Sequence, residues 1–172
     1  YLQYCTEDSI RVLCELTRKG KVVVEYGESS KLGNSKIAVS EDGLLHSALL
    51  DGLNAETGHY YQVVVTEDGK DYEFRSELLS FQTASKAASP FSFVIIADTQ
   101  GNPKVNGKIA NLAWGLRPNF LVLPGDLVDD GTLKDQWIHE FFASMNPLIS
   151  RVPLFPVLGN HEKDASHYYR YM

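Results

Sequence analysis

Three short clusters of polar residues have the composition of a metal site. They are Asp98-Thr99-Gln100, Gly125-Asp126 with Asp129 close behind, and Gly159-Asn160-His161-Glu162. Two divalent metal ions about 3.5–4 Å apart need a bridging carboxylate and further oxygen or nitrogen ligands on each ion. Asp126 suits the bridge, Asp98 suits one metal, and the side-chain oxygen of Asn160 suits the other. The three clusters together therefore predict a site for two metal ions.

Each cluster directly follows an apolar run that is typical of a short strand, at residues 91–97, 119–123 and 154–158. The first run is apolar except for Ser92, so we expect it to be a strand covered on both faces. Helical segments separate the three runs, and this alternation predicts an α/β layer with parallel pairing. Ligands bind at the carboxyl ends of the strands in such sheets. Asp98, Asp126 and Asn160 should therefore converge in one crevice.

The helical segments show apolar residues at a helical period. Residues 108–116 place Ile109, Leu112, Ala113 and Leu116 on one face, ahead of Pro118. A second helix is expected to begin at Thr132 as its N-cap, with Asp135 in a capping-box position. Residues 168–172 predict the opening of a third helix. The second helix carries an apolar stripe that indicates core rather than a cofactor site: Trp137, Ile138, Phe141, Phe142, Met145, Leu148 and Ile149.

Residues 1–84 are typical of an all-β domain. Alternating Ile10, Val12, Cys14 and Leu16 give the two-residue period of a half-buried strand. About seven short strands separated by Gly, Asn, Asp and Ser predict a β-sandwich. Residues 85–90 are small, polar and end in Pro90, so they predict a linker before the α/β domain of residues 91–172. The other β-rich runs are residues 21–26, 36–39, 44–50, 60–66 and 72–83.

In this order, the three clusters resemble the first three motif blocks of the calcineurin-like metallophosphoesterases. Residues 1–84 are similar to the fibronectin type III-like module that precedes the catalytic domain of purple acid phosphatases, with Asp51-Gly52-Leu53 and Tyr60-Tyr61 among the matching residues. The resemblance implies hydrolysis of phosphate mono- or diesters with two metal ions, Mn, Fe or Zn. It also implies that Asp98, Asp126 and Asn160 are metal ligands and that His161 is the catalytic histidine.

Four departures from the family pattern qualify this interpretation. Gln100 stands where the family has a histidine ligand, and a neutral amide oxygen is a weaker ligand than imidazole for a transition metal. Asp129 replaces the tyrosine that gives purple acid phosphatases their colour, so we expect it to support the site as a hydrogen-bond acceptor or to belong to an acidic loop. His59 stands where the sandwich usually has a corner tyrosine, and we interpret it as structural. The family's later histidine blocks are missing, so we expect a C-terminally truncated chain with weak activity or none.

Bulk properties narrow the possible partners. The net charge of −6 argues against general nucleic-acid binding, and no apolar run reaches the roughly 18 residues of a membrane span.

The chain starts at Tyr1 inside a predicted strand, which suggests a mature or trimmed product. Cys5 and Cys14 are out of hairpin register, so we expect two free thiols. A secreted or periplasmic location is implied by the family resemblance alone, and the expected partner is a small phosphate ester.

A second hypothesis comes from another class of protein. The chain could be a β-sandwich interaction module joined to a degenerate, non-catalytic α/β domain, and Gln100 favours this alternative slightly. The presence of Asp98, Asp126, Asn160 and His161 in their motif positions argues against it. We also expect the half domain to expose apolar surface, because three strands supply only one sheet, and the chain could therefore self-associate.

Overall fold

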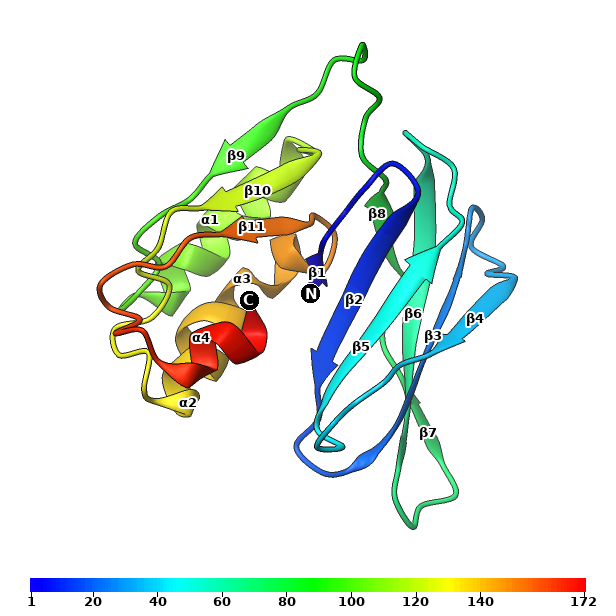
Figure 1. Ribbon diagram of the computed structural model, residues 1–172, viewed down its shortest axis with the longest axis horizontal. Coiled ribbons are helices and arrows are strands. Elements are labelled where there is room, and N and C mark those ends of the chain that lie inside the picture. Colours follow the sequence, from blue (N-terminus) through cyan, green and yellow to red (C-terminus); the bar gives the residue numbers. More distant parts are fainter. The chain divides into compact units, whose positions relative to one another are not determined.

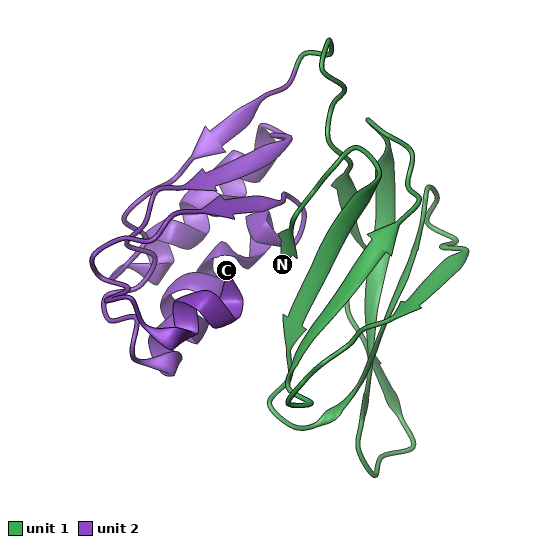
Figure 2. Cartoon of the chain, in the orientation of Figure 1, with its two compact units in different colours: residues 1–90 green, residues 91–172 purple.

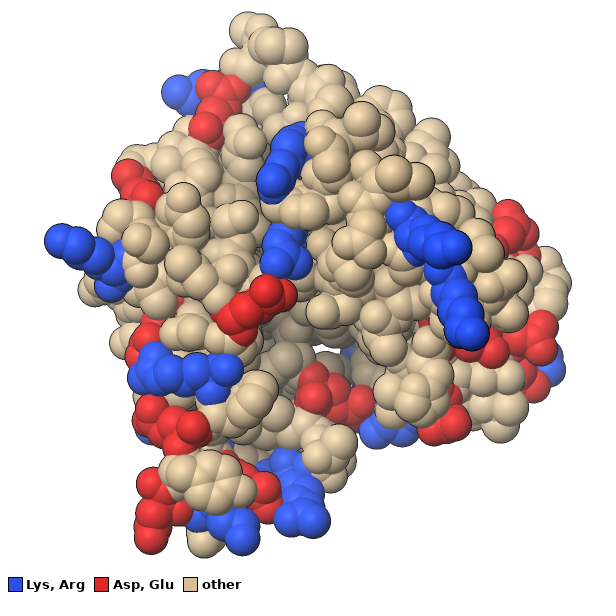
Figure 3. Space-filling view, turned by 180° about the vertical axis from the view of Figure 1, so that it is seen from behind, with Lys and Arg blue, Asp and Glu red and all other residues tan.

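The computed structural model describes residues 1–172, which divide into two compact units, Tyr1–Pro90 and Phe91–Met172 (Figure 2). The first unit contains only strands and the second alternates strands with helices (Figure 1). None of the helices combines the length and the apolar composition that a membrane span requires. On the face shown in Figure 3, acidic and basic side chains are interspersed over a largely uncharged surface.

The first unit is built from two antiparallel sheets. One sheet has the order β1 (Leu2–Gln3), β2 (Ser9–Glu15), β5 (Leu45–Asp51). The other runs β4 (Asn34–Ile37), β3 (Gly20–Gly27), β6 (Gly58–Glu67), β7 (Glu73–Arg75), with β8 (Leu79–Gln82) also paired to β6. Their apolar faces form one core: Leu2, Ile10, Val12, Val24, Ala48, Leu50, Tyr61, Leu79 and Phe81.

The predicted strand at residues 72–83 is in fact two strands. The break falls at Ser76, whose hydroxyl accepts the N–H of Val63 at 3.0 Å and whose carbonyl accepts the Gln62 side-chain amide at 2.6 Å. These side-chain bonds replace the regular ladder, so β7 and β8 pair with different stretches of β6. Such an interruption is not visible in an apolar pattern.

The structure agrees with the expectations for the two cysteines and for His59. Cys5 and Cys14 are both free thiols, and burial raises the pKa of Cys5 to about 11. His59 is 3% exposed and stacks on Phe81 with ring centroids 5.2 Å apart, as expected for a structural residue.

The second unit contains one parallel sheet in the order β11 (Leu154–Pro156), β10 (Phe120–Leu123), β9 (Phe93–Ile95). Parallel pairing was predicted from the strand–helix alternation. The helical elements are α1 (Pro103–Gly115), α2 (Lys134–Gln136), a π-helical turn η1 (Trp137–Phe142), α3 (Ala143–Ile149) and α4 (Ser166–Tyr171).

One face of this sheet is buried and the other is not. Leu121, Leu123 and Leu154 are buried, whereas Phe93, Ile95 and Phe155 are 48%, 61% and 43% exposed. The prediction that the first strand is covered on both faces was therefore wrong, because the helices lie on one side of the sheet only (Figure 1). The expectation of an exposed apolar surface on the half domain is confirmed.

The first helix differs from its prediction in its start and in its buried face. It begins at Pro103, where the Asn102 side chain caps the N–H of Val105 at 3.3 Å. Its buried residues are Asn106, Ala110 and Ala113, while Leu112 is 74% exposed. Small residues are buried because α1 approaches α3 closely, so the face with the largest apolar side chains is not the packed face. Leu116, at the C-cap, is also 73% exposed.

The second helical segment packs largely as predicted, but it begins differently, and Ile138 of the predicted stripe is 38% exposed because it lies off the buried face. Trp137, Phe141, Met145, Leu148 and Ile149 are buried and form the core beneath the sheet. Thr132 is not the N-cap: its N–H and hydroxyl both bond to Asp130 Oδ1, at 3.0 and 2.7 Å, and Leu133 takes the cap position without a side-chain bond.

Candidate metal and phosphate site

The three predicted loops meet at the carboxyl ends of β9, β10 and β11, joined by backbone hydrogen bonds. The N–H groups of Asp98 and Gln100 donate to the carbonyls of Gly125 and Asp126 at 3.4 and 3.3 Å. The N–H of His161 donates to the Asp126 carboxylate at 3.0 Å. Asp126 therefore connects the first loop to the third.

Asp98 and Asp126 both adopt left-handed backbone conformations, each with φ of 54°. Such values are uncommon outside glycine and cluster at functional sites, where the surrounding structure enforces them. The loop before Asp126 turns at Gly125, with φ of 86°, and a side chain there would lie 2.7 Å from Gly159. A side chain at Gly159 would collide with the Asp126 carboxylate itself. The two glycines thus let the second and third loops approach closely.

A fully buried carboxylate, that of Glu162, fastens the second and third loops together. It accepts the N–H groups of Asp126, Leu127 and Gly159 at 3.0, 2.5 and 2.6 Å. Sequence reasoning noted Glu162 only as the end of a motif and assigned it no role. Burial of a carboxylate requires several donors, and these three backbone N–H groups provide them.

Glu140 links the first and second loops in the same way, by accepting hydrogen bonds from a backbone N–H of each. Its Oε2 accepts the N–H of Asp129 at 3.0 Å and that of Gly101 at 3.4 Å. Glu140 lies in the π-helical turn, and such turns occur frequently at functional sites. The turn was not predicted, because apolar periodicity does not distinguish an α-helix containing one π turn from a regular α-helix.

Thr99, which is fully buried, anchors the first loop by further hydrogen bonds. Its hydroxyl donates to the Leu127 carbonyl at 2.9 Å, and its own carbonyl accepts the side-chain amide of Asn106 on α1. Thr99 and Asn106 were also missed as contributors to the site.

His161 is held in one orientation. Its Nδ1 lies 2.9 Å from the Asp129 carbonyl, and because a carbonyl only accepts, Nδ1 carries a proton. This bond raises the pKa of His161 above its ordinary 6.5; partial desolvation opposes it, and the charges of Asp126, Asp129 and Glu162 add to it. The Nε2 edge remains available. Asp129 therefore supports His161 through its backbone, and its carboxylate lies 3.5 Å from Nδ1.

The remaining predicted ligands differ in exposure. Asp98 and Asn160 are exposed at the loop surface. The side-chain oxygen of Gln100 is buried and has no hydrogen-bond partner. No group of three or more His, Cys, Asp or Glu side chains is arranged to hold a metal ion, so any such site would depend on the amide oxygens of Gln100 and Asn160 as well.

Residues 91–172 match the model of the calcineurin-like phosphoesterase family. The resemblance predicted from the three motif blocks is thus confirmed for the second unit.

Purple acid phosphatases are relatives by sequence and by structure. Purple acid phosphatase 23 of Arabidopsis thaliana is 26% identical over 146 residues, covering 70% of this chain and 31% of that protein. Purple acid phosphatase PPD1 from yellow lupin (Lupinus luteus) seeds matches 94% of this chain and 34% of its own, with a TM-score of 0.76 and 19% identity. The chain has the fold of the corresponding part of that protein and spans about a third of the length of both relatives.

Proposed function

We propose that this chain supplies part of a two-metal site for hydrolysis of phosphate mono- or diesters. The observation that carries the proposal is the connection of the three motif loops through Asp126, which is bonded by its backbone to the first loop and by its carboxylate to the third. Calcineurin-like phosphoesterases and purple acid phosphatases use dinuclear metal centres, and this chain resembles both.

The available donors fit a hard or borderline metal ion. Asp98, Asp126, Asn160 and Gln100 offer only oxygen atoms, which favours Mn²⁺ over softer ions, with Fe and Zn²⁺ as the other candidates. The buried Gln100 oxygen is unpaired, and an unpaired buried acceptor costs about 1–3 kcal/mol. A cation would offset that cost. When bound, two metal ions would polarise the phosphoryl group and lower the pKa of water.

His161 is the residue best placed to act on the substrate itself. Its Nδ1 proton is committed to the Asp129 carbonyl, so its Nε2 faces away from that bond. In the imidazolium form Nε2–H can donate to a phosphoryl oxygen or protonate the leaving oxygen. The raised pKa increases the imidazolium fraction near neutral pH.

The first unit is proposed to be a fibronectin type III-like module of residues 1–84, followed by a linker at 85–90. We also propose that the protein is located outside the cytoplasm. The non-catalytic alternative is not favoured, because the family match covers the whole second unit. We expect the isolated chain to bind metal weakly and to show little activity, since it spans about a third of its relatives.

Metal content is the direct test. The purified chain would be brought to equilibrium dialysis with Mn²⁺, Fe²⁺ or Zn²⁺, and the metal retained by the protein at equilibrium measured by mass spectrometry. Asp126→Asn should retain less metal than the wild type. Asp135→Asn, the same change on an exposed helical residue, should retain as much. Equal retention by all three proteins would contradict the proposal.

Hydrolysis of p-nitrophenyl phosphate and of bis(p-nitrophenyl) phosphate would then distinguish activity on monoesters from activity on diesters.

A further inference from the structure

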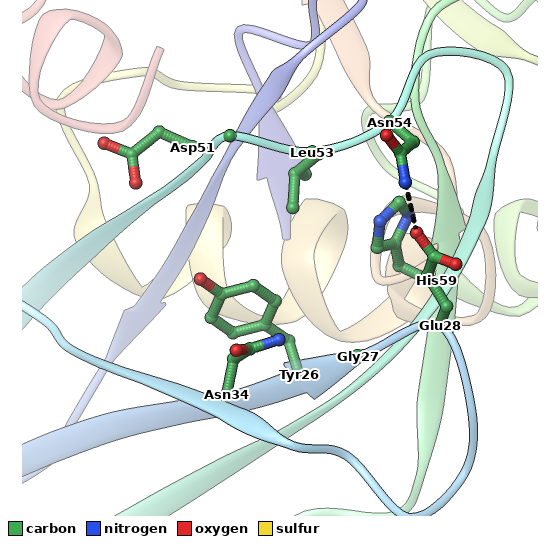
Figure 4. Close-up of a pocket in the computed structure, with 9 residues that line it drawn as sticks. Tyr26, Gly27, Glu28, Asn34, Asp51, Leu53, Asn54 and His59 are labelled. Atoms are coloured by element: carbon green, nitrogen blue, oxygen red, sulfur yellow. Dashed lines mark hydrogen bonds between the residues drawn. The ribbon is translucent and has the colours of Figure 1, made fainter.

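A cavity of about 190 Å³ lies at one end of the first unit, where the β3–β4 and β5–β6 connections meet (Figure 4). It is smaller than the roughly 300–1,000 Å³ of pockets for drug-sized ligands. Its walls come from both sheets and are mainly polar: Tyr26, Glu28, Asn34, Asp51, Asn54 and His59.

His59 is the most informative of these residues. It is 97% buried, stacks on Phe81, and its Nδ1 lies 3.0 Å from the Thr57 carbonyl. Nδ1 therefore carries the proton, which leaves Nε2 as a hydrogen-bond acceptor. Figure 4 shows the ring beside Asn54 and Glu28 in the cavity wall. Because His59 lines the cavity, a ligand there can donate an N–H or O–H to Nε2.

The other polar groups limit the ligand chemistry. The carboxylates of Glu28 and Asp51 repel phosphate and other anions. They are also partly engaged: Glu28 accepts the Asn54 side-chain amide at 2.7 Å, and Asp51 pairs with Lys36 at 3.2 Å. No three His, Cys, Asp or Glu side chains here or elsewhere are arranged for a metal ion.

What remains is an uncharged ligand that both donates and accepts hydrogen bonds. Carboxylates and His59 Nε2 accept from hydroxyls, and the amides of Asn34 and Asn54 both donate and accept. Tyr26 lies between Asn34 and Leu53 in Figure 4 and offers an aromatic ring with a polar tip. Adjacent acceptors and donors around a small cavity match adjacent hydroxyl groups on a ring. We propose that this cavity binds a neutral saccharide, one sugar ring in size, independently of phosphate ester hydrolysis.

The test is a titration of the ¹⁵N-labelled chain with neutral methyl glycosides of glucose, galactose, mannose and N-acetylglucosamine, followed by amide chemical shifts. At least one glycoside should shift the amides that line the cavity and leave those of residues 91–172 unchanged. Calcium chloride is titrated separately. No response to any glycoside, or a response to Ca²⁺ alone at the same amides, would overturn the proposal.

Two variants make the result specific. His59→Phe keeps the stacked ring and removes the Nε2 acceptor, and Glu28→Gln removes a charged acceptor at constant size. Each should weaken saccharide binding by about tenfold, or ~1.4 kcal/mol. Glu41→Gln makes the same chemical change at an exposed residue outside the cavity and should bind as the wild type does. Thermal melting of each variant reports folding, and unchanged binding by both folded cavity variants would refute the assignment.

Discussion

The carboxylate of Glu162 holds the backbone of Asp126: its Oε2 accepts the Asp126 N–H at 3.0 Å and the Gly159 N–H at 2.6 Å, in a fully buried position. The proposed bridging ligand is thus positioned by a residue that touches no proposed substrate. Buried carboxylates are tolerated when several donors converge on them.

Glu162→Gln should therefore destabilise the second unit and loosen the site. An amide has one acceptor oxygen and presents an N–H₂ group to backbone donors, so at least one buried N–H loses its partner. We expect a loss of about 1–3 kcal/mol in urea unfolding. Amide hydrogen exchange at Asp126, Leu127 and Gly159 should accelerate. Asp135→Asn, at an exposed helical site, should leave both unchanged; equal effects of the two variants would argue against a special role for Glu162.

His161 should make stability depend on pH. Its folded pKa is raised above 6.5, chiefly by the bond to the Asp129 carbonyl. The stabilisation from its charged form is thus complete below about pH 6.5 and disappears as the pH rises through the folded pKa. The free energy of unfolding of the metal-free protein should therefore fall as the pH rises through this range. In His161→Gln the free energy of unfolding should depend less on pH. An NMR titration of the ring protons reports the pKa itself, and a midpoint below that of a histidine in a short peptide would contradict the structure.

The exposed face of the parallel sheet predicts self-association. Phe93 and Phe120 stack with centroids 5.1 Å apart, and Phe120 meets Phe155 edge-on at 5.7 Å, so an aromatic row crosses all three strands. Monomers rarely expose large contiguous apolar patches. Sedimentation should show concentration-dependent dimers or larger species. Phe93→Ser should reduce association with little loss of stability, whereas Tyr72→Ser, an exposed aromatic of the first unit, should not. A monodisperse wild-type monomer would exclude this prediction.

The boundary between the two units should be open to proteases. Residues 85–90 form no helix or strand, and Lys86 is exposed within them. Exposed irregular segments are preferred cleavage sites. Brief trypsin treatment should cut first after Lys86, and Lys86→Gln should delay the cut. First cleavage within β3 or β9 would place the boundary elsewhere.

The sequence predicted the architecture well and the supporting contacts poorly. Parallel strands, loop convergence and the Trp137 core followed from periodicity and motif order, because those features repeat over many residues. The buried face of α1 did not, since Leu112 and Leu116 resemble core residues but remain exposed in the structure. Glu140 and Glu162 were missed as contributors because most of their partners are backbone N–H groups of other loops, and single residues carry no periodic signal.

Metal binding should separate the roles of Asp126 and Asp129. Asp126 is bonded to the first loop through its carbonyl and to the third through its carboxylate. Asp129 instead contributes its backbone, with its N–H on Glu140 and its carbonyl on His161, and its side chain is 61% exposed. Asparagine keeps that backbone intact. Isothermal titration with Mn²⁺ should therefore show a larger loss of affinity for Asp126→Asn than for Asp129→Asn, with tenfold weaker binding corresponding to about 1.4 kcal/mol. If Asp129→Asn proved the more damaging change, its carboxylate would be a ligand and the assignment of the second loop would have to be reversed.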